Sequence, residues 1–380
     1  MTTARSDAPS TPAGVTARTS VRLPDFPWDS LLPYDKAARA HPDGIVDLSI
    51  GTPVDATPEL AQAALQAGAD APGYPKTIGT PELRAAAAGW LTRRFGVTGV
   101  GVEHILPTIG SKELVASLPS HLGYGPGDTV VVPQLAYPTY EVGARLAGCD
   151  VVASDSTTAL GPQRVAMAWI NSPANPTGRV LPATHLRKLV AWARERGVLL
   201  VSDECYLECA WDAEPVSILH PDVCGGKFDG LLSVHSLSKR SNLAGYRAGF
   251  VAGDAAVVAA LHEVRRHAGL IVSAPVQAAA TALLGDDAHV DEQRARYRAR
   301  RASLRSALET AGFRIDHSEA ALYLWATRSE SCWETLGWLA ERGILVAPGS
   351  FYGPSGAEHV RVALTGTDER VAAACSRLTA

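Results

Sequence analysis

The sequence predicts an α/β protein with a mainly parallel β-sheet, helices on both of its faces and a smaller α+β lobe after it. Two observations carry this prediction. Over the first two thirds of the chain, short valine-rich apolar runs alternate with segments of helical periodicity. In the last third, long helical segments are followed by short strands mixed with helices. The length of 380 residues is enough for two domains, or for one large domain with a lobe.

Five apolar runs are expected to be buried strands, because they are too short for helices and rich in valine. Each run ends in a polar or glycine-rich turn. They lie within residues 128–134, 165–173, 197–204, 230–238 and 246–254.

Two segments between these runs carry clear helix signals. Residues 181–197 place four apolar side chains on one face and end at Gly197. Those side chains belong to Leu186, Leu189, Val190 and Ala193. Residues 80–96 begin with Thr80 as a helix N-cap and end at Gly96.

The last third predicts the smaller lobe. Residues 267–285 and 289–312 have the pattern of long helices. The short strands expected after them lie within residues 313–316, 322–326, 343–349 and 359–364. Two further helices are expected at residues 332–343 and 368–378.

Composition narrows the class of protein. The net charge of −4 gives no sign of a basic face for nucleic acid, and no apolar run approaches the length that spans a bilayer. The six cysteines form no CxxC pair, and Cys205 and Cys209 are too isolated to suggest a metal site. Residues 1–20 lack the apolar core of a secretion signal, so we expect a disordered tail on a cytoplasmic protein.

Polar side chains gather where the predicted strands end. In open α/β sheets ligands bind at the carboxyl ends of the strands, so these side chains are the candidate site. They are Asn175, Asp203, Tyr206, Ser236, Ser238 and Lys239, with Arg247 before the last strand and Gly110 and Ser111 at a helix start.

Each of these residues alone has an ordinary structural reading. Asp203 would be a helix cap and Asn175 a turn residue. Tyr206 would be a half-buried aromatic side chain and Lys239 a surface lysine. Together they supply an amine, a carboxylate, an amide, a phenol and donors enough for a phosphate.

This set fits pyridoxal 5′-phosphate. Lys239 would bond to the aldehyde, and Asp203 would keep the pyridine nitrogen protonated. Asn175 and Tyr206 would donate to the ring 3′-oxygen. We assign the phosphate to the remaining donors. These are Gly110, Ser111 and Lys112 at the helix start, with Ser236 and Arg247. Ser238 is a further cofactor-binding candidate.

The segment SLSKRSNLAGYRAG at residues 236–249 resembles the Schiff-base segment of the class I and II aminotransferases. NPTG at 175–178 and SDECY at 202–206 resemble the cofactor-ring motifs of that family, in the same order. The resemblance runs from about residue 22 to the C-terminus. It implies the type I fold of pyridoxal-phosphate transferases, with a seven-stranded sheet in the large domain.

The resemblance also implies four further site residues. Gly51 would approach the substrate carboxylate, and Arg361 would bind it together with Asn175. Tyr137 would stack on the cofactor ring. Tyr74 would reach the phosphate of the neighbouring subunit, so a homodimer is expected.

The same resemblance divides the chain into domains. Residues 21–46 would join the small domain, residues 47–275 would form the large cofactor-binding domain, and residues 276–380 would form the small domain.

Within the family, GTPVD, GSKEL and LYLWATR are most similar to actinobacterial-type N-succinyldiaminopimelate aminotransferases of lysine synthesis. These enzymes interconvert N-succinyl-LL-2,6-diaminopimelate plus 2-oxoglutarate and N-succinyl-2-amino-6-oxopimelate plus glutamate. A transaminase for an aspartate, aromatic or aliphatic amino acid, or a lyase, stays open. A binding module would need a DNA-binding segment, and a nucleotide-binding protein would need a glycine fingerprint that the sequence lacks.

One residue departs from the family pattern. Arg240 stands where relatives carry a smaller residue after the lysine, so its side chain either points away from the site or alters the pocket. The distal substrate contacts are open as well. Candidates for them are Trp28, Lys112, Glu319, Tyr323 and Tyr352.

Overall fold

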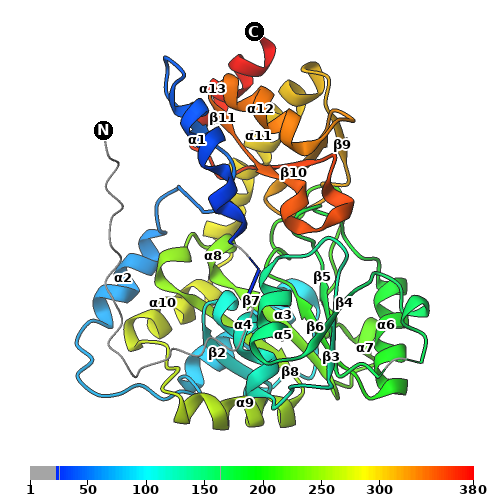
Figure 1. Cartoon of the computed structure of the whole chain (residues 1–380). Coiled ribbons are helices and arrows are strands. Elements are labelled where there is room, and N and C mark those ends of the chain that lie inside the picture. Colours follow the sequence, from blue (N-terminus) through cyan, green and yellow to red (C-terminus); the bar gives the residue numbers. More distant parts are fainter. Residues whose placement is uncertain (1–22, 25, 163) are drawn as a thin grey trace, which may run out of the picture.

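The structure is a computed structural model that describes residues 23, 24, 26–162 and 164–380, so the tail predicted at residues 1–20 lies outside the described part. Seven strands of the described chain form one sheet (Figure 1). Its order is β2 (Ile105–Ile109), β8 (Ala248–Gly253), β7 (Leu231–Ser236), β6 (Leu199–Asp203), β5 (Met167–Asn171), β3 (Thr129–Val132) and β4 (Asp150–Ala153). Strand β8 runs antiparallel to both neighbours and every other pair is parallel, which confirms the mainly parallel sheet.

The five predicted strands are β3, β5, β6, β7 and β8, and two strands were not predicted. Strand β2 contains Pro107, which lacks the N–H that a central strand needs. Strand β4 is only four residues long and has no fully buried side chain. Both lie at the edges of the sheet, where a proline and a weak apolar pattern are tolerated.

Helices cover both faces of the sheet. One face packs against α3 (Pro81–Phe95), α6 (Ala183–Arg196), α7 (Pro221–Cys224) and α10 (Ala274–Gly285). The other packs against α4 (Ser111–His121), α5 (Thr139–Leu146) and α9 (Ala255–His267).

The two helix predictions in the first domain are confirmed. Thr80 Oγ1 accepts a hydrogen bond from Leu83 N at 3.1 Å and caps α3. Gly197 ends α6 at φ 65°, and the four apolar side chains predicted to share a face of α6 are all buried.

The prediction of one long helix over residues 267–285 is wrong for its first part. Helix α9 was not predicted and ends at His267, and Gly269 follows at φ 70°, a conformation that favours glycine. Helix α10 begins only at Ala274, with Pro275 in its first turn. It packs on α2 (Glu59–Ala67) and α3, beside the sheet. The domain division stays a prediction, and this packing favours a boundary near Asp286 rather than at residue 276.

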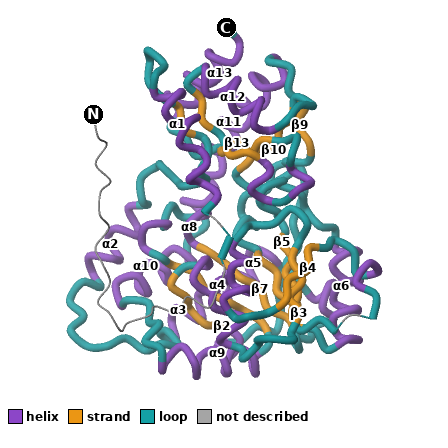
Figure 2. The backbone as a smooth tube through the Cα atoms, in the orientation of Figure 1, coloured by secondary structure: helices purple, strands orange, loops and turns teal. Residues whose placement is uncertain are grey.

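The smaller lobe holds a four-stranded antiparallel sheet and the helices around it (Figure 2). The strand order is β12 (Ala347–Pro348), β13 (Val360–Ala363), β10 (Tyr323–Thr327) and β9 (Arg314–Asp316). Its helices are α11 (Ala288–Thr310), α12 (Cys332–Glu341) and α13 (Asp368–Thr379). Strand β1 (Val46–Asp47) pairs in parallel with β11 (Ile344–Leu345), and α1 (Leu32–Arg39) packs on α12, so the N-terminal segment joins this lobe.

No helix among the described residues is long and apolar enough to cross a membrane.

Candidate active site

The candidate site lies where the carboxyl ends of β5, β6 and β7 meet. Asn171 at the end of β5 lies opposite Asp203 at the end of β6, and Asp203 lies opposite Val234 in β7. The short helix α8 (Leu237–Arg240) follows β7 directly and carries Lys239. Lys239 Nζ donates a hydrogen bond to Gly51 O at 2.5 Å, so a loop 188 residues away in sequence closes over the lysine.

Asp203 is held from two sides. Tyr140 Oη donates to Asp203 Oδ2 at 2.8 Å, and Cys205 N donates to Asp203 Oδ1 at 3.2 Å. Burial raises the pKa of the Asp203 carboxyl, and the hydrogen bonds from Cys205 and Tyr140 oppose that shift. A cationic partner would offset the burial further. A protonated pyridine nitrogen is such a partner.

Tyr140 was not predicted as a site residue. It follows the predicted stacking residue Tyr137 by three positions and lies in the first turn of α5, and Tyr137 lies just before that helix. Its ring stacks on Trp169 at 4.8 Å and meets Tyr137 edge-on at 5.8 Å. The spacing in LAYPTYE was the signal that could have identified it.

The start of α4 forms an anion cradle. Gly110 precedes this helix at φ 72°, and a side chain there would collide with the guanidinium of Arg247. A Cβ at Gly249 would lie 3.3 Å from Ser111 N. Arg247 therefore lies beside a helix N-terminus, and glycines at positions 110 and 249 leave space next to it. This arrangement suits a phosphate.

Two serines from the lysine segment complete this region. Ser236 Oγ accepts from Ser238 N at 3.1 Å and caps α8, and both side chains are buried. The hydroxyl of Ser236 can still donate its own proton to a bound anion.

Arg361 on β13 is the buried cation of the site. Its Nη1 donates to Asn175 Oδ1 at 2.9 Å and its Nη2 donates to Ser49 O at 2.7 Å. The guanidinium carbon lies 4.0 Å from the centre of the Tyr323 ring. Among the described residues its Nε has no hydrogen-bond partner, so the side chain retains a donor for a carboxylate.

Tyr206 and Gly51 meet at Tyr323. The hydroxyls of Tyr206 and Tyr323 are 2.9 Å apart, and a side chain at position 51 would collide with Tyr323 Oη. Tyr323 belongs to β10 of the small lobe, so the two lobes touch at this point. Among the open pocket candidates, Tyr323 is therefore in contact with the predicted site.

Of the other pocket candidates, Tyr352 also lies against a predicted site residue, whereas Trp28 and Glu319 have structural contacts. Trp28 packs against Phe351 with ring centres 5.3 Å apart. Glu319 Oε2 accepts from Val180 N at 2.9 Å, so it supports the loop after Asn175. The Tyr352 ring centre lies 5.0 Å from the Arg361 guanidinium.

Two predicted cofactor ligands do not join the site within this chain. Tyr74 is 99% exposed, and Lys112 is exposed in the first turn of α4. For Tyr74 this agrees with a role toward a second subunit, and that role stays a prediction.

Arg240 points away from the lysine into a buried cluster, as the first of the two alternatives predicts. Its Nη1 donates to Leu283 O at 3.0 Å, and its Nε lies 3.6 Å from Glu208 Oε1. The guanidinium also lies 5.4 Å from the centre of the Trp90 ring. Burial lowers the pKa of Arg240 to about 10, so it stays charged at neutral pH.

A second buried pair lies beside Asp203 and Ser236. Glu204 and His235 approach to 3.9 Å, the distance of an ion pair. Glu204 Oε1 accepts from Ile218 N at 2.7 Å, and His235 Nε2 contacts Ser233 Oγ at 2.9 Å. Burial raises the pKa of Glu204 to about 7 and lowers the pKa of His235 to about 3. Both side chains are almost inaccessible to water, so we take the neutral forms as the dominant ones despite the short distance.

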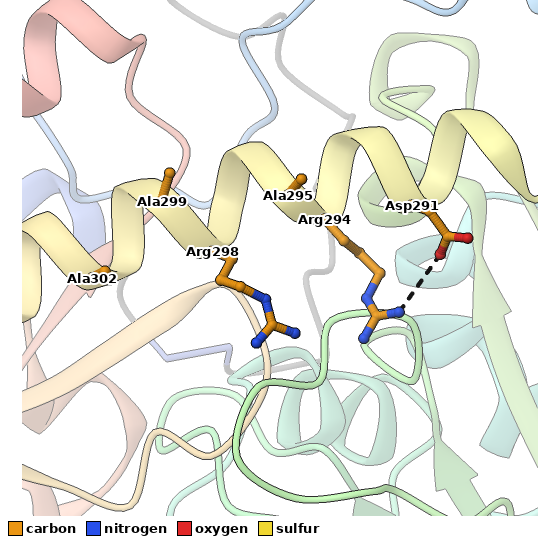
Figure 3. A pocket seen from close by; sticks show the side chains of 6 residues that line it. All are labelled: Asp291, Arg294, Ala295, Arg298, Ala299 and Ala302. Atoms are coloured by element: carbon orange, nitrogen blue, oxygen red, sulfur yellow. Dashed lines mark ion pairs between the residues drawn. The ribbon is translucent and has the colours of Figure 1, made fainter.

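A hollow along α11 lies apart from these residues (Figure 3). Small alanine side chains and two arginines line it, with Arg294 in an ion pair with Asp291 at 3.6 Å. None of the predicted site residues takes part in this hollow.

The assembled groups fit pyridoxal phosphate. They include an amine at a strand end, a buried carboxylate, an amide, two phenols and an anion cradle, and a buried guanidinium stands nearby. The roles of the single residues follow from chemistry and stay predictions.

Comparisons with known proteins agree on one family. The sequence profile of "Aminotransferase class I and II" matches residues 43–378. The chain is 63% identical to a probable aminotransferase of Mycobacterium tuberculosis, over 95% of this chain and 86% of that protein. It is 61% identical to the 4-dedimethylamino-4-oxo-anhydrotetracycline transaminase of Streptomyces rimosus, over 94% of this chain and 99% of that enzyme. A solved structure, a probable N-succinyldiaminopimelate aminotransferase from Thermus thermophilus, is similar at 29% identity and a TM-score of 0.82, covering 93% of this chain and 99% of that one.

We predict that Lys239 is the residue that bonds covalently to the cofactor. Borohydride treatment of the yellow holoenzyme should bleach it and fix the cofactor to the peptide that contains Lys239. Lys239→Ala should retain cofactor through the phosphate and ring contacts, but borohydride should fix none of it. Lys112→Ala is the control and should label normally. A label on any lysine other than Lys239 would overturn the assignment.

We predict opposite effects of Glu204 and His235 on the pH dependence of stability. The raised pKa of Glu204 means that the folded state binds its proton more tightly, so its contribution falls as pH rises from 4.5 to about 7. The loss is on the order of 3 kcal/mol at full burial. The lowered pKa of His235 acts in reverse, and its contribution rises between pH 3 and 6.5.

Glu204→Gln separates the two effects. The Tm of the variant should climb from pH 5 to 6.5, whereas the Tm of the wild type stays flatter over the same range. Parallel Tm curves for the two proteins would show that Glu204 is ionised in the folded state throughout.

Proposed function

The chain belongs to the class I and II aminotransferases, which use pyridoxal 5′-phosphate, and from this premise we propose that it acts on N-succinylated diaminopimelate. In the biosynthetic direction, glutamate and N-succinyl-2-amino-6-oxopimelate would give 2-oxoglutarate and N-succinyl-LL-2,6-diaminopimelate. The amino group passes from the α-carbon of glutamate to the keto carbon of the acceptor. The keto oxygen of the acceptor leaves as water, and water supplies the keto oxygen of 2-oxoglutarate.

One observation carries the amino-acid part of this proposal. Arg361 is a buried guanidinium bound to Asn175 and Ser49, and its Nε is free. An α-carboxylate is common to all substrates and products of the proposed reaction. A planar guanidinium binds a carboxylate through paired hydrogen bonds that a lysine cannot reproduce.

The residues around the lysine suit proton transfer at the substrate α-carbon. The cofactor, when bound, supplies an aldehyde carbon for the amino group and a ring that withdraws electrons. Lys239 Nζ would act as the general base that takes the proton from the substrate α-carbon. Gly51 O would accept a hydrogen bond from the protonated Lys239, as it does in the structure. Asp203 would hold the ring nitrogen of the cofactor and Tyr206 its ring oxygen.

The diaminopimelate substrate is supported by the segments GTPVD, GSKEL and LYLWATR, and by the similarity to the Thermus thermophilus structure. A second candidate is supported by a different observation. The 61% identity to the Streptomyces rimosus transaminase extends over 99% of that enzyme, so a polycyclic ketone is the alternative amino acceptor.

We predict that glutamate and N-succinyl-LL-diaminopimelate exceed phenylalanine, leucine and alanine in kcat/KM. A pocket that accepts both glutamate and a succinylated chain must offer polar donors to their distal carboxylates. An apolar substrate would leave those donors unpaired, at about 1–3 kcal/mol for each buried group. The measurement is a panel of amino donors with one keto acid other than 2-oxoglutarate, because glutamate with 2-oxoglutarate returns the same two compounds. A panel of ketone acceptors with glutamate completes it. An equal kcat/KM with phenylalanine or leucine would contradict the diaminopimelate assignment. A higher kcat/KM with a polycyclic ketone than with the other acceptors would favour the second candidate.

The homodimer and the cytoplasmic location belong to the proposal as well. We predict that Tyr74 donates to the cofactor phosphate of the partner, because its side chain is almost fully exposed in a single chain. Tyr74→Phe should weaken cofactor retention on dialysis, and Tyr34→Phe, whose ring packs on Trp333 in the small lobe, should not. A fully active monomer in sedimentation would exclude the shared site.

A further inference from the structure

The loop of residues 51–57, here named the substrate loop, covers the lysine without secondary structure of its own. Gly51 O accepts the hydrogen bond from Lys239 Nζ. Val54, three residues further on, and Ile50, just before the loop, are half exposed and contribute little packing. A loop of this kind stays in place only if specific contacts anchor it.

Asp55 supplies the anchor. Arg300 Nη1 donates to Asp55 Oδ2 at 2.7 Å and Arg300 Nη2 donates to Asp55 Oδ1 at 2.6 Å, which is a paired guanidinium–carboxylate contact. Gln293 Nε2 donates to Asp55 Oδ2 at 2.7 Å. Both donors come from α11, the long helix at the start of the small lobe.

The contact is nearly closed to water. The Arg300 side chain is 3% exposed and that of Asp55 is 10% exposed. Burial alone would raise the pKa of Asp55, but the hydrogen bonds from Arg300 and Gln293 lower it below its usual value. The pair is therefore ionised, and removing either member would leave the other charge buried without its partner.

A third residue connects this anchor to the lysine segment. Asn242 follows Lys239 by three residues, and its Nδ2 donates to Gln293 Oε1 at 3.0 Å and to Ala56 O at 3.3 Å. The network thus joins the substrate loop, the lysine segment and α11.

We propose that the Asp55–Arg300 pair is a latch that holds the substrate loop closed, so that Gly51 faces both the lysine and the substrate. Asp55 and Arg300 are positioning residues, since neither touches the reacting atoms. The latch rests on amino transfer at Lys239, and it does not depend on which amino acid is the substrate.

The latch predicts a specific kinetic change. When the closed loop is only part of the population, the apparent affinity for substrate falls by that fraction, whereas the complex that does form still reacts. Asp55→Asn should therefore raise the KM for glutamate and for the keto acid alike by about tenfold, with kcat within about twofold of wild type.

The chain offers a matched control on the same arginine. Arg300 Nε also donates to Asp368 Oδ1 at 2.7 Å, and Asp368 lies at the start of α13, away from the substrate loop. Asp368→Asn removes a charge partner from Arg300 but leaves the loop contact intact. Its KM values should stay within about twofold of wild type.

A second variant keeps the test valid if Asp55→Asn does not fold. Gln293→Met removes the hydrogen bonds to Asp55 and Asn242 with little change of shape, and should raise both KM values by about threefold. Limited proteolysis of each holoenzyme gives an independent readout. The substrate loop should be cut faster in Asp55→Asn and Gln293→Met than in wild type or Asp368→Asn.

Two outcomes would overturn the latch. One is an Asp55→Asn enzyme with wild-type KM values and wild-type proteolysis. The other is an equal rise of KM in Asp368→Asn, which would show that Arg300 only stabilises the lobe. The KM values are measured with glutamate and any keto acid that the wild type accepts. The test of the latch therefore does not depend on whether the wild type accepts the diaminopimelate substrate.

Discussion

The parallel pairing of β5, β6 and β7 is the constraint on which the candidate site depends. Parallel strands end at one edge of the sheet, so the register that pairs Asn171 with Asp203 also brings the start of α8 and Lys239 to that edge. Strand β8 runs the other way beside β7 and returns Gly249 toward the start of α4. The anion cradle and the lysine are thereby held on the same rigid sheet.

The small lobe completes the site through buried charges and hydroxyls. Arg361 and Tyr323 come from adjacent antiparallel strands and reach the ends of the large sheet. Around this junction, each described buried cation has an anionic or carbonyl partner. Arg361 donates to Ser49 O, and Arg300 donates to Asp55. Such pairing favours one arrangement of the two lobes, because a shift would strand a charge without water.

Much of the fold was predictable because local signals are strong in this chain. The caps of α3 and α6 and the five valine-rich strands depend on neighbours within a few residues. The misses have physical reasons. Edge strand β2 contains a proline, and edge strand β4 has a weak apolar pattern. The break between α9 and α10 comes from Gly269 and Pro275 within an otherwise apolar stretch.

The sequence by itself determined the chemical groups of the site, because an amine, a carboxylate and an amide at successive strand ends have few other uses together. Only the tertiary structure decided which other side chains contact these groups and hold them in place. Tyr140 on Asp203, the direction of Arg240 and the Asp55–Arg300 pair join residues that are 43 to 245 positions apart. No local pattern encodes such a contact, because the partner of a side chain is decided by the packing of whole elements. For Tyr140 and Arg240 this is the packing of helices on the large sheet, and for Asp55–Arg300 it is the packing of the two lobes.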